Sequence, residues 1–145
     1  MQTTVSDILR HKGKTIISVR PDQSIFELVQ IYIEHNIGAV LVMRDEKLVG
    51  IVSERDVARN VVLQGKDEHS TQVSEIMSGD VITVGPDMTV EACMALMTNN
   101  RVRHLPVLEA TALIGVVSIG DLVNSLISQK QFVIEQLESY ITGRI

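Results

Sequence analysis

The stretch "GIVSERDVAR", residues 50–59, recurs as "GVVSIGDLVN", residues 115–124. Both read glycine, two apolar residues, serine, two variable residues, aspartate and two apolar residues, at a constant offset of 65 positions. A glycine and an apolar pair before a serine are typical of a strand that ends where a helix begins. The chain therefore makes the same Ser-x-x-Asp corner twice.

The repetition extends well beyond these two stretches. Residues 18–59 align without a gap with residues 83–124, with identities such as Pro21 and Pro86. Upstream, "VSDIL" of residues 5–9 matches "VSEIM" of residues 73–77, and the loop that follows is longer in the first copy, "RHKGK" against "SG". A gapless match of this length indicates an internal duplication. We divide the chain into a first repeat of residues 1–65, a second of 66–125 and an extension of 126–145.

Each repeat predicts the order strand, helix, strand, strand, helix. Runs rich in β-branched and apolar residues predict the strands. These are residues 15–19, 39–43 and 48–53 in the first repeat, and 80–84, 105–108 and 113–118 in the second.

The capping signals predict where the first helix of each repeat begins. Ser24 and Glu27 form a capping box that opens a helix over residues 25–35, and Asp87 or Thr89 caps a helix over 90–98. Both helices carry apolar residues around most of their circumference, so we expect them to be largely buried. The last helix of each repeat begins just after the serine of its corner.

Each repeat alone is too small to bury a comfortable core, at about 55 to 60 residues. We therefore predict an α+β fold in which two β-α-β-β-α units pack about a pseudo-twofold axis. In the extension, Leu126, Val133 and Tyr140 are spaced by seven, as are Ile127, Ile134 and Ile141. This spacing predicts a long helix, ended at Gly143, whose apolar seam faces its own domain or a second subunit. A homodimer is the expected assembly.

Composition limits the classes of function. The chain has 145 residues, 45% of them apolar, a mean hydropathy of +0.20 and a net charge of -5. The negative charge argues against nucleic acid or an anionic membrane as a partner. No apolar run approaches the roughly 20 residues that span a bilayer, and the N-terminus lacks a signal-peptide core. The single Cys93 allows no internal disulfide. We expect a cytoplasmic protein.

A Ser-x-x-Asp corner has two interpretations, which are compatible. The serine and aspartate can simply cap the helix that follows. A helix N-terminus also attracts anions, and a carboxylate in its first turn can accept hydrogen bonds from adjacent sugar hydroxyls. Arg55 in the first corner can bind a phosphate as a bidentate donor. Gly120 at the matched place in the second corner offers no charge but permits close backbone approach.

The duplicated unit with "GIVSERD" and "GVVSIGD", together with "RHLPVL" at residues 103–108, resembles a tandem pair of cystathionine-β-synthase (CBS) domains, a Bateman module. The resemblance covers residues 5–125. It implies two clefts between the repeats that bind an adenosine-containing ligand. AMP is expected first, then ATP or ADP, NAD and S-adenosylmethionine.

The same resemblance implies the site residues. Asp56 and Asp121 would hold the ribose. Beside ribose and phosphate would lie Ser53 with Arg55 in one cleft and Ser118 with Gly120 in the other. The base would meet main chain, and the matched positions are Thr15 to Ile17 with Gly38 and Ala39 for one cleft, and Asp80 to Ile82 with Arg103 and His104 for the other. Arg103 and His104 occupy places where basic residues often meet phosphate.

These features predict a regulatory module, not an enzyme, that senses adenine nucleotides and passes their occupancy to an unidentified effector protein. One alternative is a structural homodimerisation domain with vestigial clefts. A weaker alternative is a small nucleotide hydrolase, although "GIVSE" is not the Gly-x-Ser-x-Gly elbow of a nucleophilic serine. The four histidines have neither the i, i+4 spacing nor the neighbouring cysteines of a metal site, so we expect no metal.

Overall fold

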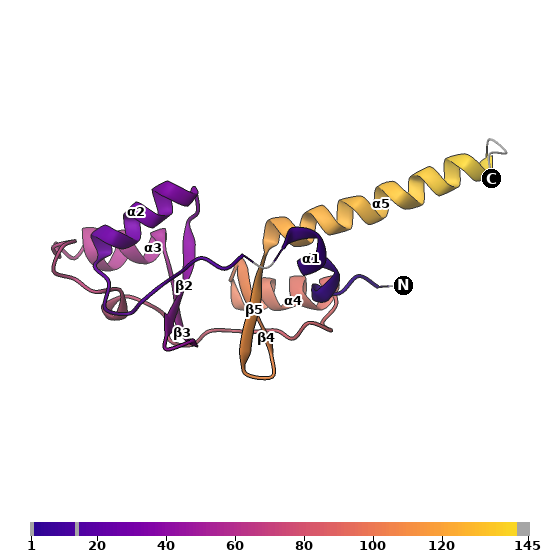
Figure 1. Cartoon of the computed structure of the whole chain (residues 1–145). Helices are drawn as coiled ribbons and strands as arrows, with labels where there is room; N and C mark the ends of the chain where they lie inside the picture. Colours follow the sequence, from indigo (N-terminus) through magenta and orange to yellow (C-terminus); the bar gives the residue numbers. More distant parts are fainter. Residues whose placement is uncertain (1, 14, 142–145) are drawn as a thin grey trace. The chain divides into compact units, whose positions relative to one another are not determined.

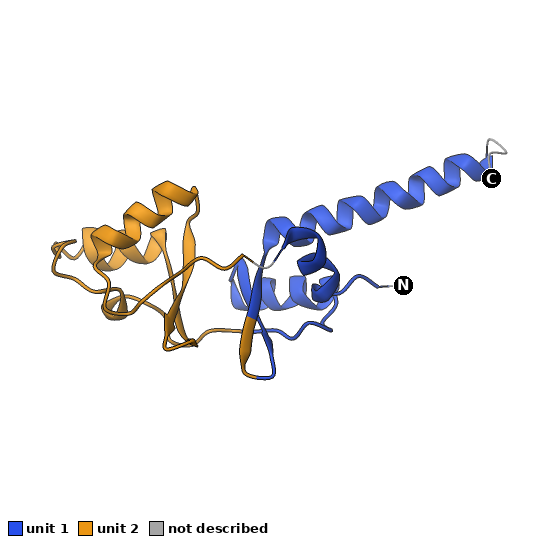
Figure 2. Ribbon diagram, viewed as in Figure 1, with its two compact units in different colours: residues 1–14, 83–110, 114–145 blue, residues 15–82, 111–113 orange. Residues whose placement is uncertain are grey.

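The computed structural model describes residues 2–13 and 15–141, so the predicted helix end at Gly143 lies outside the described residues (Figure 1). The described chain forms two compact units (Figure 2). Unit 1 contains residues 2–13, 83–110 and 114–141, and unit 2 contains residues 15–82 and 111–113. Both units combine a small sheet with helices, which confirms the α+β class and the duplication predicted from the sequence.

Unit 2 contains a sheet in the order β1-β2-β3. The strands are β1 (Ser18–Val19), β2 (Ala39–Arg44) and β3 (Lys47–Ser53). Strands β2 and β3 form an antiparallel hairpin, and β1 lies parallel to β2. The strand predicted over residues 15–19 is thus confined to its last two residues. Half-buried Ile17 packs against the core of the unit from outside the ladder.

The helices of unit 2 cover its sheet. They are α2 (Ile25–His35), α3 (Glu54–Val57), a π-helical turn (Ala58–Val62) and a 3₁₀ turn (Val73–Glu75). Helix α2 has the predicted bounds and the predicted capping box. The expectation that α2 is largely buried is wrong, because it buries Ile25, Leu28 and Tyr32 but exposes Phe26, Val29 and Ile33. A helix on a single small sheet has one covered face, and its apolar outer face stays open.

Unit 1 repeats this plan with fewer strand residues. Strands β4 (His104–Glu109) and β5 (Ala112–Ser118) form the hairpin, and β5 belongs to unit 1 from residue 114 onward. Val84 makes an isolated parallel bridge to Val107 where a strand over residues 80–84 was predicted. Helix α4 (Val90–Asn100) is capped by Thr89, whose Oγ1 accepts from the N–H of Ala92.

Two more helices complete unit 1. Helix α1 (Val5–Lys12) begins at the Thr4 cap, and α5 (Ile119–Ile141) follows the second corner. Figure 1 shows the second half of α5 extending beyond the other elements of this unit.

The leader segments of the two repeats are exchanged. The leader segment of the first repeat, residues 2–13, packs in unit 1 with the rest of the second repeat, and the leader segment of the second repeat, residues 71–78, packs in unit 2 with the rest of the first. Matched hydrogen bonds hold them: Val5 N–H donates to Met88 O at 2.9 Å in unit 1, and Val73 N–H donates to Gln23 O at 2.9 Å in unit 2. Each compact unit is therefore built from segments that are distant in the sequence.

Candidate functional site

The first Ser-x-x-Asp corner lies in unit 2, where β3 meets α3. The N–H of Ser53 donates to Asp56 Oδ2 at 2.9 Å, and the N–H of Asp56 donates to Ser53 Oγ at 3.3 Å. These reciprocal bonds satisfy donors that a helix N-terminus leaves unpaired. The capping interpretation of this corner is therefore confirmed. Arg55 between them is exposed, and within residues 2–13 and 15–141 it has no ion-pair partner.

Two acidic residues, Glu54 and Asp56, lie at the first corner. The N–H of Glu54 donates to Gly38 O at 2.9 Å, and Ala39 lies opposite Ser53 in the hairpin. Tyr32, buried beneath, donates its hydroxyl to Val52 O at 2.9 Å. Burial raises the pKa of Tyr32, and the negative charges of Asp56 and Glu54 raise it further, so the hydroxyl remains a donor.

The second corner lies in unit 1, where β5 meets α5. The N–H of Ser118 donates to Asp121 Oδ2 at 2.8 Å, and the N–H of Asp121 donates to Ser118 Oγ at 3.1 Å. The N–H of Ile119 donates to Arg103 O at 2.9 Å, which repeats the bond between Glu54 and Gly38 at the matched positions. The two corners therefore share one backbone design.

A lysine that the sequence did not single out enters the second corner. Lys12 Nζ donates to Asp121 Oδ2 at 2.6 Å and to Val116 O at 2.8 Å. Burial tends to raise the pKa of Asp121, but the hydrogen bonds and charge of Lys12 and the bonds from Ser118 outweigh it and lower the pKa. Asp121 is thus ionised at neutral pH and paired with an ammonium group.

The longer leader of the first repeat explains this lysine. In unit 2 the leader ends in a backbone bridge, in which Ser78 N–H donates to Ile51 O at 2.9 Å. In unit 1 helix α1 continues to Lys12, and a side-chain ammonium reaches the carbonyl of Val116, the residue matched to Ile51. The only signal in the sequence was the difference between "RHKGK" and "SG".

Basic residues surround the second corner more closely than the first. Burial lowers the pKa of half-buried His104, and the positive charges of Lys12 and Arg103 lower it further, whereas Asp121 partly opposes them. His104 is therefore neutral at pH 7. At the matched places in the first repeat stand Gly38 and Ala39, which carry no charge.

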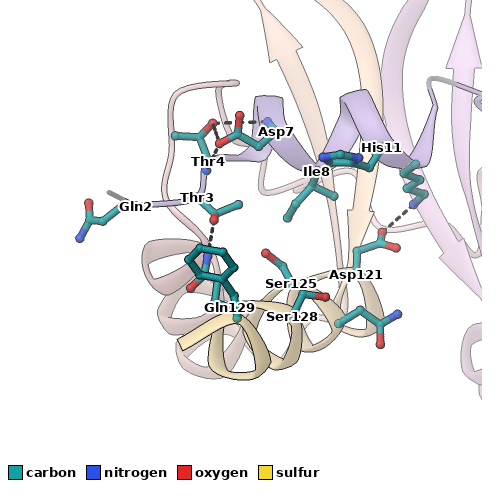
Figure 3. Close-up of a pocket in the computed structure, with 13 residues that line it drawn as sticks. Gln2, Thr3, Thr4, Asp7, Ile8, His11, Asp121, Ser125, Ser128 and Gln129 are labelled. Atoms are coloured by element: carbon teal, nitrogen blue, oxygen red, sulfur yellow. Dashed lines mark hydrogen bonds and ion pairs between the residues drawn. The ribbon is translucent and has the colours of Figure 1, made fainter. Parts of the chain in front are cut away.

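A groove of about 1010 Å³ runs between α1 and α5 in unit 1 (Figure 3). Asp121 and His11 lie at one end of the groove, and Thr3 and Gln129, which are hydrogen-bonded to each other, lie at the other. The second corner thus opens onto this groove, which Ile8 and Phe132 also line.

The remaining predicted positions divide between the units. Exposed Thr15, half-buried Ile17, Gly38 and Ala39 belong to unit 2, as does the first corner. Asp80 and Ile82 also belong to unit 2, whereas Arg103 and His104 belong to unit 1. The grouping of these four around one ligand stays a prediction.

Two features are absent from the described residues. No three His, Cys, Asp or Glu side chains among them gather in a way that could hold a metal ion. In the same part of the chain, no helix is both long and apolar enough to cross a membrane.

Comparison with known proteins defines the class to which this duplicated fold belongs. The family model described as "CBS domain" matches residues 5–63 and again residues 73–128. The chain belongs to the CBS-domain family, and it carries two copies of the domain.

Three relatives illustrate the range of the family. The mitochondrial CBS domain-containing protein CBSX3 of Arabidopsis thaliana is 37% identical over 97% of this chain and 73% of its own length. The crystal structure of the CBS domain NE2398 superposes with a TM-score of 0.83 at 50% identity, over 88% of this chain and 99% of that one. The CBS domain pair of MJ0100 was solved with 5-methylthioadenosine and S-adenosyl-L-methionine. It superposes with a TM-score of 0.77 at 30% identity, over 90% of this chain and 99% of that one.

Proposed function

We propose that the chain is a regulatory module that binds an adenosine-containing ligand at its two Ser-x-x-Asp corners and passes its occupancy to an effector protein. The observation that carries this proposal is how each aspartate is held. In both corners Oδ2 accepts hydrogen bonds from within the fold, and Oδ1 accepts none from any described residue. A carboxylate fixed by one oxygen presents the other, pre-oriented, to a pair of sugar hydroxyls.

The ligand class is supported by the solved relative with bound nucleosides. The CBS pair of MJ0100 holds 5-methylthioadenosine and S-adenosyl-L-methionine, both adenosine derivatives. Because this chain has an aspartate in each corner, we propose the same class here, with AMP first and ATP, ADP, NAD or S-adenosylmethionine as the other candidates. The adenosine ribose would lie on Asp56 or Asp121, with its phosphate toward the helix N-terminus.

Calorimetric titration of Asp56→Ala and Asp121→Ala tests the proposal. Each substitution removes hydrogen bonds from a charged acceptor, so affinity at that corner should fall at least about tenfold. Asp87→Ala, an exposed aspartate outside both corners, is the matched control for the lost charge. Because each corner aspartate also caps a helix, melting temperatures must accompany the titrations. If both corner variants bound the ligands with wild-type affinity, the two aspartates would serve only as helix caps and the proposal would be wrong.

We also propose that the module is a homodimer joined through α5. From Ile127 onward this helix exposes a series of apolar side chains, namely Ile127, Val133, Ile134, Leu137 and Ile141. Apolar residues at this spacing form the seam of paired helices. The seam is open in the single chain, so of the two predicted ways to cover it a sister chain is the one that the exposure favours.

The rival function is a purely structural dimerisation domain, and the exposed seam of α5 is the observation that favours it. The two functions differ in one measurable respect. A structural domain would dimerise but would bind none of the five candidate ligands at millimolar concentration.

A further inference from the structure

We propose that Lys12 makes the second corner selective for phosphate-bearing ligands, whereas the first corner favours adenosine ligands of low negative charge. This inference rests on the proposed function and assigns a different ligand charge to each corner. Lys12 is not part of either repeated corner. It reaches the second corner from the exchanged leader helix α1.

The ammonium group of Lys12 is held by two bonds. It lies 2.6 Å from Asp121 Oδ2 and 2.8 Å from Val116 O, and the side chains of Lys12 and Asp121 are 38% and 21% exposed. A charge that is fixed and partly shielded from water acts more strongly on a ligand than a free surface lysine does. An ammonium group has three N–H donors, so one remains for a ligand oxygen.

The balance of charge differs between the corners. The second corner has two positive charges, on Lys12 and Arg103, and one negative charge, on Asp121, whereas His104 is neutral. The first corner has one positive charge, on Arg55, and two negative charges, on Glu54 and Asp56. The residues matched to Glu54 and Arg55 in the second corner are uncharged. A polyphosphate therefore meets net positive charge at one corner and net negative charge at the other.

Removal of Lys12 would act on charged and uncharged ligands differently. Adenosine itself carries no charge, and its ribose would bind Asp121 Oδ1, to which Lys12 is not bonded. A phosphate-bearing ligand would lose a charge-assisted donor, and it would also face the carboxylate of Asp121 without its counter-ion. The affinity ratio of ATP to adenosine at the second corner is therefore the quantity that reports on Lys12.

Titration of the full chain with adenosine, AMP and ATP tests the inference. The Asp56→Ala background weakens binding at the first corner, so that the tighter phase of each titration reports on the second corner. There, Lys12→Met should lower the ratio of ATP to adenosine affinity about tenfold or more and leave adenosine affinity within about twofold. Lys12→Arg should restore most of the ratio, and Lys66→Met, an exposed lysine of the linker, should not change it. Added salt should shrink the ratio of the background chain more than that of Lys12→Met.

Three outcomes are decisive. An unchanged ratio in Lys12→Met, with binding still dependent on Asp121, would overturn the role of Lys12 and leave the proposed function intact. An equal loss for adenosine and ATP would show that Lys12 only holds α1 in place, and it too would overturn the inference. Wild-type binding by Asp121→Ala, or no binding of any of the three ligands to the unmodified chain, would overturn the function itself and the inference with it.

Discussion

Gly115 lies against Leu9 so closely that a β-carbon on the glycine would come within 2.7 Å of Leu9 Cδ2. In unit 2 the matched Gly50 stands in the same relation to Met77, whose Sδ would lie 2.7 Å from such a β-carbon. Leu9 and Met77 are themselves matched residues of the two exchanged leaders. The glycine that opens each "GIVS" or "GVVS" stretch thus makes room for a leader segment.

Substitution of Gly50 or Gly115 by alanine should weaken the packing of the leader segment that lies against that glycine. At Gly50 the added carbon would also lie 2.9 Å from the backbone oxygen of Ser78, which cannot swing aside. We expect Gly50→Ala to cost about 1–3 kcal/mol in the free energy of unfolding, as overpacking does. Gly115→Ala should cost less, because only the flexible end of Leu9 must move.

Urea denaturation measures both effects. Gly85→Ala is the matched control, since a β-carbon there meets nothing within 4 Å. Equal stability of all three variants would contradict the close approach of the leaders.

Replacement of Arg55 by alanine should weaken phosphate-bearing ligands at the first corner. The guanidinium is exposed and has no ion-pair partner among the described residues, so it is available to a ligand phosphate. In an Asp121→Ala background, calorimetry should show a larger loss for ATP than for adenosine, and more so at low salt. Arg59→Ala, on the same exposed segment, serves as the control. A uniform loss across the ligands would contradict a phosphate contact.

Acidification from pH 7 to pH 5.5 should destabilise the fold through His104. Its pKa is lowered by burial and by Lys12 and Arg103, so the unfolded chain binds a proton at this residue more readily than the folded one. The stabilisation of the fold by neutral His104 is complete above the pKa of histidine in the unfolded chain, about 6.5. It is lost as the pH falls through the pKa of His104 in the folded chain.

Thermal melts across this range should show a shallower pH dependence in His104→Ala, which copies Ala39 of the first repeat. His35→Ala, at an exposed histidine, should keep the steeper wild-type dependence. Identical profiles for His104→Ala and the wild type would count against this role.

Charge placed on the seam of α5 should separate the proposed dimer. Buried apolar side chains of this size contribute about 1.5–3 kcal/mol each, so Ile134→Asp with Leu137→Asp removes most of the favourable contact. Analytical ultracentrifugation should show half the wild-type mass, while the melting of the two units changes little. Gln136→Asp, on the same helix but off the seam, should remain a dimer. A monomeric wild type, or an unaltered mass in the double variant, would refute the seam as an interface.

Local patterns predicted much of this fold. Ser24 and Glu27 correctly predicted the first residue of α2, because a capping box determines where a helix begins. The strand predicted over residues 80–84 failed, since only Val84 finds a partner in the ladder and β-branched composition cannot say how much of a run is paired.

The exchange of leaders and the place of Lys12 could not be read from the sequence. "VSDIL" and "VSEIM" are similar to each other, so the sequence alone cannot tell which repeat each of them packs on. The serine and aspartate of each corner were identified because their spacing is local. Lys12 was missed because it meets Asp121 across 109 positions of the chain.

The exchange also sets an order of events for a chain that grows from its N-terminus. Helix α1 is synthesised before the segments on which it packs, and Lys12 lies 104 residues ahead of Val116, whose carbonyl it contacts. During that interval the amphipathic leader emerges without its own docking surface, while residues 15–82 already contain everything that unit 2 needs except residues 111–113. Domains complete themselves in the order in which the ribosome delivers them, and contacts of such long range form slowly. Helix α1 is therefore translated early but ordered late, and the second corner gains its lysine only after Val116 and Asp121 have been translated.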